Sequence, residues 1–87
     1  MSIYYFYKED CTACQLLKKA VESMFEKIND NVYKYMIDVE KDNELVDRYK
    51  IFVIPTIILL NDKGEELKKW RSDNPPFKEI ISLANKY

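Results

Sequence analysis

Two cysteines separated by two residues, Cys11 and Cys14, constrain this sequence more than any other feature. The chain has 87 residues and no histidine. A small secreted scaffold relies on several disulfides, and two cysteines form only one. A structural zinc site takes about four cysteine or histidine ligands, more than one copy of the chain supplies. Outside these two contexts, a C-x-x-C pair is more often redox-active than structural.

The cysteine pair falls where a strand pattern gives way to a helix pattern. Ile3–Tyr7 is a continuous run of β-branched and aromatic residues, which predicts a strand covered on both faces. Lys8–Asp10 is charged and predicts a loop. From Ala13 to Ile28 the apolar residues recur at helical spacing with charged residues between them, which predicts an amphipathic helix.

The remaining sequence alternates between strand and helix patterns. A strand, a helix and a second strand in succession favour a right-handed crossover and a parallel strand pair. Asn61–Gly64 predicts a hairpin turn, with Gly64 supplying the unusual φ angle. We predict one α/β domain over residues 1–87, ordered β-α-β-α-β-β-α, with a four-stranded mixed sheet and helices on both faces. The later strands are expected at residues 32–38, 57–60 and 66–70, and the later helices at 42–49 and around 77–84.

Charge and hydropathy exclude several classes of partner. The net charge is −1, with 14 basic and 15 acidic residues spread along the chain, so no nucleic-acid partner is expected. The longest uncharged apolar stretch, residues 51–61, is too short to span a bilayer and contains Pro55. The first residues lack the basic start and small-residue cleavage site of a signal peptide. We therefore expect a soluble, cytoplasmic monomer without a membrane partner.

The position of the two cysteines at a helix start predicts different roles for them. Bridging needs Cα atoms roughly 4.4–6.8 Å apart, which one helical turn satisfies. Cys11 is expected at the tip, where unpaired backbone N–H groups and the helix dipole lower the thiol pKa below its free value of about 8.5. Cys14 is expected one turn inward and shielded. Cys11 would then attack a substrate disulfide, and Cys14 would resolve the mixed disulfide, with no metal or organic cofactor.

Three other interpretations of the pair remain open. A structural disulfide is one, although closing a four-residue loop constrains the unfolded chain little. A zinc ion shared between two chains is the second, and inert buried thiols are the third.

The motif residues resemble those of thioredoxins and glutaredoxins. The resemblance lies in an apolar strand leading into Cys11-Thr12-Ala13-Cys14 and in Ile54-Pro55-Thr56 at the third strand, and it covers nearly the whole chain. It implies a thioredoxin-like fold, a cis Pro55 beside the cysteines, and pairing of the Ile54 backbone with an extended substrate segment. It also implies protein-disulfide substrates, contacts to them from Thr12 and Ala13, and a thioredoxin reductase or glutathione as electron source.

Several residues depart from the family pattern. Asp10 stands where thioredoxins usually have tryptophan, and residues 70–73 lack the glycines of glutaredoxins. By the same resemblance, Tyr5 takes the place of a buried aspartate and Lys34 that of its companion lysine. Because Tyr5 cannot act as a base near neutral pH, Asp10 or Glu9 is a candidate for proton transfer. Asp10 and Lys34 are thus candidate modulators of the cysteine pKa values, and the alternative is that Asp10 and Glu9 are solvated loop charges.

The sequence leaves alternative functions open. A protein-disulfide reductase or a dedicated electron donor fits best, and a disulfide oxidant or isomerase is the nearest chemical alternative. A glutathione-dependent, glutaredoxin-type reductase, a redox-sensing binding module and a zinc-bridged homodimer also remain. Trp70, the only tryptophan, is expected to serve packing, or else an apolar rim near the cysteines.

Overall fold

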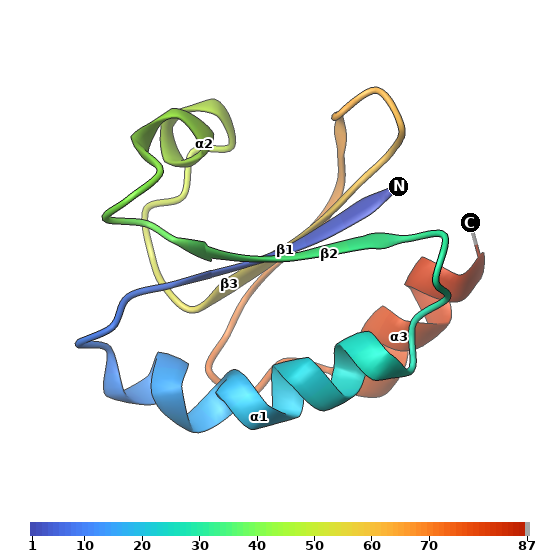
Figure 1. The fold of residues 1–87 in the computed structure, drawn as a ribbon, viewed down its shortest axis with the longest axis horizontal. Helices are drawn as coiled ribbons and strands as arrows, with labels where there is room; N and C mark the ends of the chain where they lie inside the picture. Colours follow the sequence, from blue (N-terminus) through green and yellow to red (C-terminus); the bar gives the residue numbers. More distant parts are fainter. Residues whose placement is uncertain (87) are drawn as a thin grey trace.

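The elements follow one another in the predicted order. The computed structural model describes residues 1–86, and Tyr87, the last residue of the predicted domain, lies outside this range. The α/β architecture predicted from the sequence is confirmed (Figure 1). The strands and helices are β1 (Ser2–Tyr7), α1 (Thr12–Glu26), β2 (Tyr33–Asp38), α2 (Asn43–Arg48), β3 (Thr56–Leu60), β4 (Glu66–Arg71) and α3 (Phe77–Lys86).

The four strands form one mixed sheet in the order β2-β1-β3-β4. β1 runs parallel to β2 and antiparallel to β3, and β3 runs antiparallel to β4. Helices α1 and α3 cover one face of the sheet, and α2 lies on the other (Figure 1). Because β1 is central, its carboxyl end delivers the chain directly to the start of α1, where the cysteines lie.

Each face of the sheet has its own hydrophobic core. On the face of α1 and α3, Ile3 and Tyr5 of β1 pack with the helices and are almost fully buried. On the face of α2, Phe6 is fully buried and packs with Tyr49 and Ile51. Burial on both sides of β1 is what its unbroken apolar sequence predicted.

Helix α1 ends earlier than its apolar pattern predicted. It stops at Glu26, where the backbone N–H groups of Lys27 and Ile28 donate to the carbonyls of Met24 and Phe25. Ile28 is only 2 % exposed, so it is buried from the turn that follows rather than from the helix itself. The sequence pattern extended the helix to Ile28 because this buried turn residue falls at the next apolar position of the helical spacing.

The hairpin between β3 and β4 uses the predicted turn. Asn61 Oδ1 accepts hydrogen bonds from the backbone N–H groups of Lys63 and Glu65, at 2.9 Å each. Gly64 has a φ of +77°, a conformation that favours glycine. All five residues of β3 are buried, which fixes the strand that begins at the site described next. Within residues 1–86, no helix has the length and apolar character needed to cross a bilayer.

Candidate functional site

Cys11 and Cys14 form a disulfide across the first turn of α1, with Cα atoms 5.2 Å apart. Cys11 is the N-cap residue of the helix, and its Sγ accepts a hydrogen bond of 3.1 Å from the Cys14 backbone N–H. Cys14 is 1 % exposed, whereas Cys11 is half-buried. The Cys11 sulfur therefore occupies the position in which a helix N-terminus favours negative charge.

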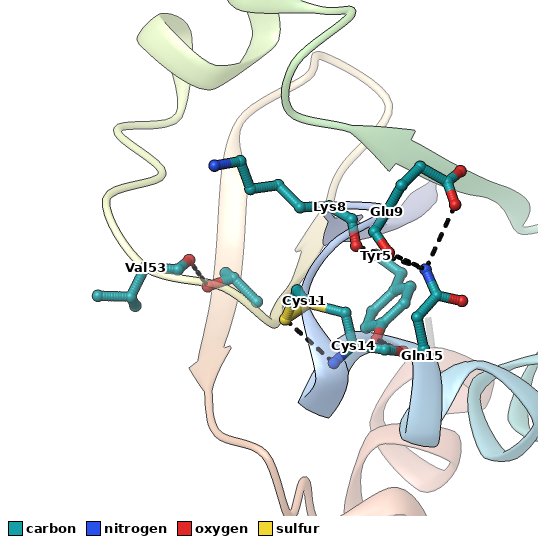
Figure 2. Close-up of a disulfide and its surroundings, with 8 residues drawn as sticks. Tyr5, Lys8, Glu9, Cys11, Cys14, Gln15 and Val53 are labelled. Atoms are coloured by element: carbon teal, nitrogen blue, oxygen red, sulfur yellow. Dashed lines mark hydrogen bonds between the residues drawn. A yellow bond between two sulfur atoms is a disulfide. The ribbon is translucent and has the colours of Figure 1, made fainter.

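The loop before Cys11 is held by Gln15, which lies on the first turn of α1 (Figure 2). The Gln15 side-chain amide donates to the carbonyl oxygens of Lys8 and Glu9, at 3.4 and 3.2 Å. It also contacts the Glu9 carboxylate at 3.4 Å. Glu9 is thus engaged with Gln15 in an exposed loop, and Asp10 is exposed beside Cys11.

Tyr5 lies beneath the buried cysteine. Its hydroxyl donates a 2.8 Å hydrogen bond to the Cys14 carbonyl oxygen (Figure 2). Its ring stacks on that of Tyr7, with centroids 6.0 Å apart. Tyr5 is 1 % exposed, and burial raises its pKa to about 12. The phenol therefore stays protonated near neutral pH and is a hydrogen-bond donor there, not a base.

The segment before β3 closes the site from the other side. The Ile54–Pro55 peptide bond is cis, and the Thr56 hydroxyl donates to the Val53 carbonyl at 2.7 Å. A cleft of about 230 Å³ separates this segment from the helix start and from the β4–α3 loop. Its lining residues are Ala13, Val53, Ile54, Pro55, Arg71, Ser72 and Asp73.

The structure thus brings together most of the residues singled out in the sequence, but not all. Ile54, Pro55 and Ala13 share the cleft, while Thr12 is exposed and does not line it. Lys34 is not at the site. Its amine donates to the carbonyl oxygens of Ile28 and Asn29, at 3.0 and 2.9 Å, just beyond the far end of α1.

The displacement of Lys34 follows from the parallel pairing of β1 and β2. Lys34 is paired with Ile3 near the start of β1, whereas Cys11 follows the end of that strand. Cys11 begins α1 and Ile28 follows its end, so the 15-residue helix separates them by about 22 Å. The prediction that Lys34 modulates the cysteine pKa values is therefore wrong. Its ammonium group instead stabilises the partial negative charge on carbonyl oxygens near the C-terminal end of α1.

Trp70 serves packing. It is 8 % exposed within the core of α1 and α3, and its indole N–H donates to Glu79 at 3.1 Å. It does not line the cleft beside the cysteines.

A comparison with known proteins assigns the family. A family model described as a thioredoxin-like domain matches residues 2–87. The chain belongs to this thioredoxin-like family. Among curated proteins, it is 26% identical over 87 residues to thioredoxin 2 of Plasmodium falciparum, matching 98% of this chain and 53% of that protein. It is 28% identical over 83 residues to thioredoxin of Bacillus subtilis, matching 94% of this chain and 77% of that protein.

Solved thioredoxin structures share the fold. A mutant thioredoxin of Halobacterium salinarum superimposes with a TM-score of 0.80 at 26% identity, over 99% of this chain and 73% of that one. Fasciola hepatica thioredoxin gives a TM-score of 0.84 at 23% identity, over 95% and 79% of the two chains. The thioredoxin-like chain nevertheless spans only about half the length of the Plasmodium relative, and 34% of a rice chloroplast thioredoxin Y.

The thioredoxin-like site contains sulfur and few other metal-binding groups. Among residues 1–86, no three histidine, cysteine or acidic side chains are grouped as a metal ion would require. The disulfide between Cys11 and Cys14 is the redox-active group that the site presents.

Sequence reasoning missed three contributors to the site. Gln15 donates to the backbone of the loop before Cys11, and the Thr56 hydroxyl donates to the Val53 carbonyl. Arg71 lines the cleft. The only signal for Thr56 was its place after Pro55. Gln15 is a polar residue of an amphipathic helix and Arg71 a charged residue at a strand end, and no sequence pattern places either of them at the site.

Proposed function

We propose that this chain is a thiol–disulfide oxidoreductase that reduces protein disulfides through Cys11 and Cys14. The observation that carries the proposal is the asymmetry of the pair: a half-buried sulfur at a helix N-terminus is bridged to a fully buried one. Membership of the thioredoxin-like family supports the same chemistry.

The reaction proceeds in two balanced exchanges. The Cys11 thiolate attacks one sulfur of a substrate disulfide, forming a mixed disulfide and releasing the other substrate sulfur as a thiolate that takes a proton. Cys14, as a thiolate, then attacks the Cys11 sulfur, which releases the second substrate thiolate. The substrate gains two electrons and two protons, and the chain is left with the Cys11–Cys14 disulfide.

The cleft beside the disulfide is the proposed docking place for the substrate. An extended segment pairs with the Ile54 backbone and lies along the cis Pro55, with Ala13 on its opposite side. Thr12 is exposed next to Cys11 and contacts the departing half of the substrate.

Because each turnover leaves Cys11 and Cys14 oxidised, a separate two-electron donor must reduce their disulfide back to the dithiol. We propose a flavoprotein thioredoxin reductase as that donor, with glutathione as the alternative, and a monomer acting in the reducing cytoplasm. The glutathione alternative draws on Ser72 and Asp73, which line the cleft together with Arg71. The hydroxyl and the guanidinium suit a carboxylate of glutathione, and the Asp73 carboxylate suits its ammonium group.

Insulin reduction tests the proposal. The wild-type chain is assayed with NADPH and thioredoxin reductase, and in parallel with glutathione and its reductase. We expect turnover with the first system, and Cys11→Ser should abolish it. Full activity in Cys11→Ser would refute the proposal. Slow turnover with both systems, together with a partner captured in one redox state only, would instead favour a redox-sensing module.

A further inference from the structure

Gln15 is bonded to the chain on both sides of Cys11. Its backbone N–H donates to the Cys11 carbonyl oxygen at 3.0 Å, as the first bond of the helix. Its side-chain amide reaches back over Cys11 to the carbonyl oxygens of Lys8 and Glu9 (Figure 2). The Cys11 backbone N–H donates to the same Lys8 carbonyl at 3.3 Å. One residue thus connects the loop before Cys11 to the helix that follows it.

The groups around the Gln15 side chain call for a hydrogen-bond donor at this position. Three oxygen atoms contact its amide nitrogen, namely two backbone carbonyls and the Glu9 carboxylate at 3.4 Å, and all three are acceptors. A side-chain amide nitrogen supplies two N–H donors and carries no net charge. Gln15 is exposed, yet its side chain folds back onto the loop.

The contacts of Gln15 matter most when the disulfide is open. The Cys11 sulfur accepts the Cys14 N–H while the Cys11 backbone keeps its N-cap conformation, with φ −90° and ψ 108°. In the oxidised chain the disulfide also holds the sulfur over the first turn of α1. Reduction removes that covalent link. The position of Cys11 then depends on its own two backbone hydrogen bonds and on the Gln15 side chain.

We propose that Gln15 is a positioning residue, which keeps the Cys11 thiolate over the backbone N–H groups of the first turn of α1 in the reduced chain. A thiolate at this place is stabilised by the Cys14 N–H and by the positive end of the helix. Gln15 acts through the backbone of the loop and not on the sulfur itself. This role rests on the proposed function, in which the Cys11 thiolate is the attacking group.

Charged groups near Cys11 could change its pKa without moving it, so the test must hold them constant. Titratable and charged side chains face Cys11 from the loop before it, from the far wall of the cleft and from the first turn of α1 with the strand beneath. They are Lys8, Glu9, Asp10, Arg71, Asp73, Cys14 and Tyr5. Gln15→Ala removes no charge and frees one of them, the Glu9 carboxylate, from its contact.

Alkylation of Cys11 by iodoacetamide across pH 5–9 measures the effect, in a Cys14→Ser background that leaves a single thiol. Gln15→Ala destabilises the thiolate and should raise the midpoint by a few tenths of a unit, so that the rate at pH 6 falls about two- to threefold. The same shift should appear when Glu9→Gln is also present. Gln15→Lys keeps a donor, and in about 0.5 M salt, which screens its added charge, its midpoint should return to that of Gln15.

Ser23→Ala is the matched control. Ser23 is an exposed, uncharged residue eight residues further along α1, about 12 Å from Gln15 by the helix rise. Its replacement changes helix propensity as Gln15→Ala does, but it lies away from the loop. The midpoint of Cys11 alkylation should therefore be unchanged in Ser23→Ala.

The outcomes distinguish this role from the function on which it rests. An unchanged midpoint in Gln15→Ala, or an equal shift in Ser23→Ala, would overturn the positioning role while insulin reduction by the wild type remains. A shift that disappears in the Glu9→Gln background would assign the effect to the Glu9 charge and refute positioning. If Cys11 alkylates with the midpoint of a free thiol, about 8.5, even with Gln15 present, there is no stabilised thiolate to position and the role is refuted. Loss of insulin reduction by the wild type would instead refute the proposed function.

Discussion

The hydrogen bond from Tyr5 to the Cys14 carbonyl places a phenol where a carboxylate would serve as a proton acceptor. A phenol with a pKa of about 12 cannot accept the Cys14 proton near neutral pH. The proton released when Cys14 becomes a thiolate must then pass to solvent or to another group. Tyr5 therefore affects the buried cysteine by holding its backbone in place, because the Tyr5 hydroxyl hydrogen-bonds to the Cys14 carbonyl oxygen in the first turn of α1.

Tyr5→Phe tests this contact through stability. Loss of one buried hydrogen bond should lower the free energy of unfolding at pH 7 by about 1 kcal/mol. The raised pKa means that the folded chain holds the phenol proton more tightly than the unfolded chain, whose tyrosine titrates near 10. This stabilisation is complete below pH 10 and is lost as the pH rises through about 12.

Urea unfolding followed by circular dichroism measures the effect from pH 7 to pH 11.5. The advantage of the wild type over Tyr5→Phe should shrink across the upper part of this range, and it should be constant below pH 9. An advantage that begins to change near pH 7 would mean that Tyr5 titrates there and is available as a base.

The exposed carboxylate of Asp10 allows a prediction about Cys11 itself. Asp10 precedes Cys11 at the start of α1, where its negative charge opposes the stabilisation of a thiolate. Asp10→Asn should therefore move the midpoint of Cys11 alkylation to lower pH by a few tenths of a unit, and added salt should reduce the difference. Iodoacetamide labelling across pH 5–9 measures it, with Glu22→Gln on the exposed face of α1 as the control. An unchanged curve removes any role for Asp10.

Helix α2 ends in a conformation that its sequence does not suit. Lys50 has a φ of 53°, in the left-handed region, and the Ile51 N–H closes the helix end on the Val46 carbonyl at 3.0 Å. Glycine adopts this backbone without the Cβ clash that lysine incurs. The segment that follows leads directly to Phe52 and the cis proline, so the helix end also positions the site.

Lys50→Gly should raise the free energy of unfolding by about 1 kcal/mol. The matched control is Lys68→Gly, an exposed lysine within β4, which should lower stability by about 0.5–1 kcal/mol because glycine weakens a strand. Denaturant midpoints of both variants measure the difference. Destabilisation by Lys50→Gly equal to that of the control would show that the left-handed turn does not limit stability.

Local patterns predicted most elements because each core face repeats at the period of its element. β1 is buried on both sides and reads as an unbroken apolar run, and α3 repeats Ile80 and Ala84 toward the sheet. Boundaries were less predictable: α1 begins at Thr12, one residue before its first apolar position, because a capping sulfur rather than an apolar contact starts it.

Local sequence patterns could not predict which side chains distant in the sequence lie close together in the fold. Cys11, Pro55 and Ile54 were brought together by family resemblance, whereas periodicity alone joins none of them. Lys34 shows the limit of that resemblance, because two carbonyls at the end of α1 offer its amine closer partners than the cysteines do. The exposure of Phe52 was likewise not predictable, because Phe52 lies within a continuous apolar stretch of the sequence.

Closing the disulfide should stabilise the whole molecule modestly. A cross-link over a four-residue loop restricts the unfolded chain by roughly 2 kcal/mol in the chain-entropy treatment. Reduction should therefore lower the free energy of unfolding by about that amount and leave a cooperative transition, because both hydrophobic cores remain. Urea unfolding with and without a phosphine reductant measures this, and the double variant Cys11→Ser/Cys14→Ser should be insensitive to the reductant. A reduced chain that unfolds without cooperativity would contradict it.

The most direct test of the account is the trapping of a mixed disulfide with insulin. Pre-reduced Cys14→Ser and Cys11→Ser each retain one thiol, and each is mixed with insulin and analysed by intact mass. The account predicts a covalent adduct at Cys11 in Cys14→Ser, and almost none in Cys11→Ser because Cys14 is 1 % exposed. Equal adducts in the two variants would contradict the assignment of Cys11 as attacker and Cys14 as resolver.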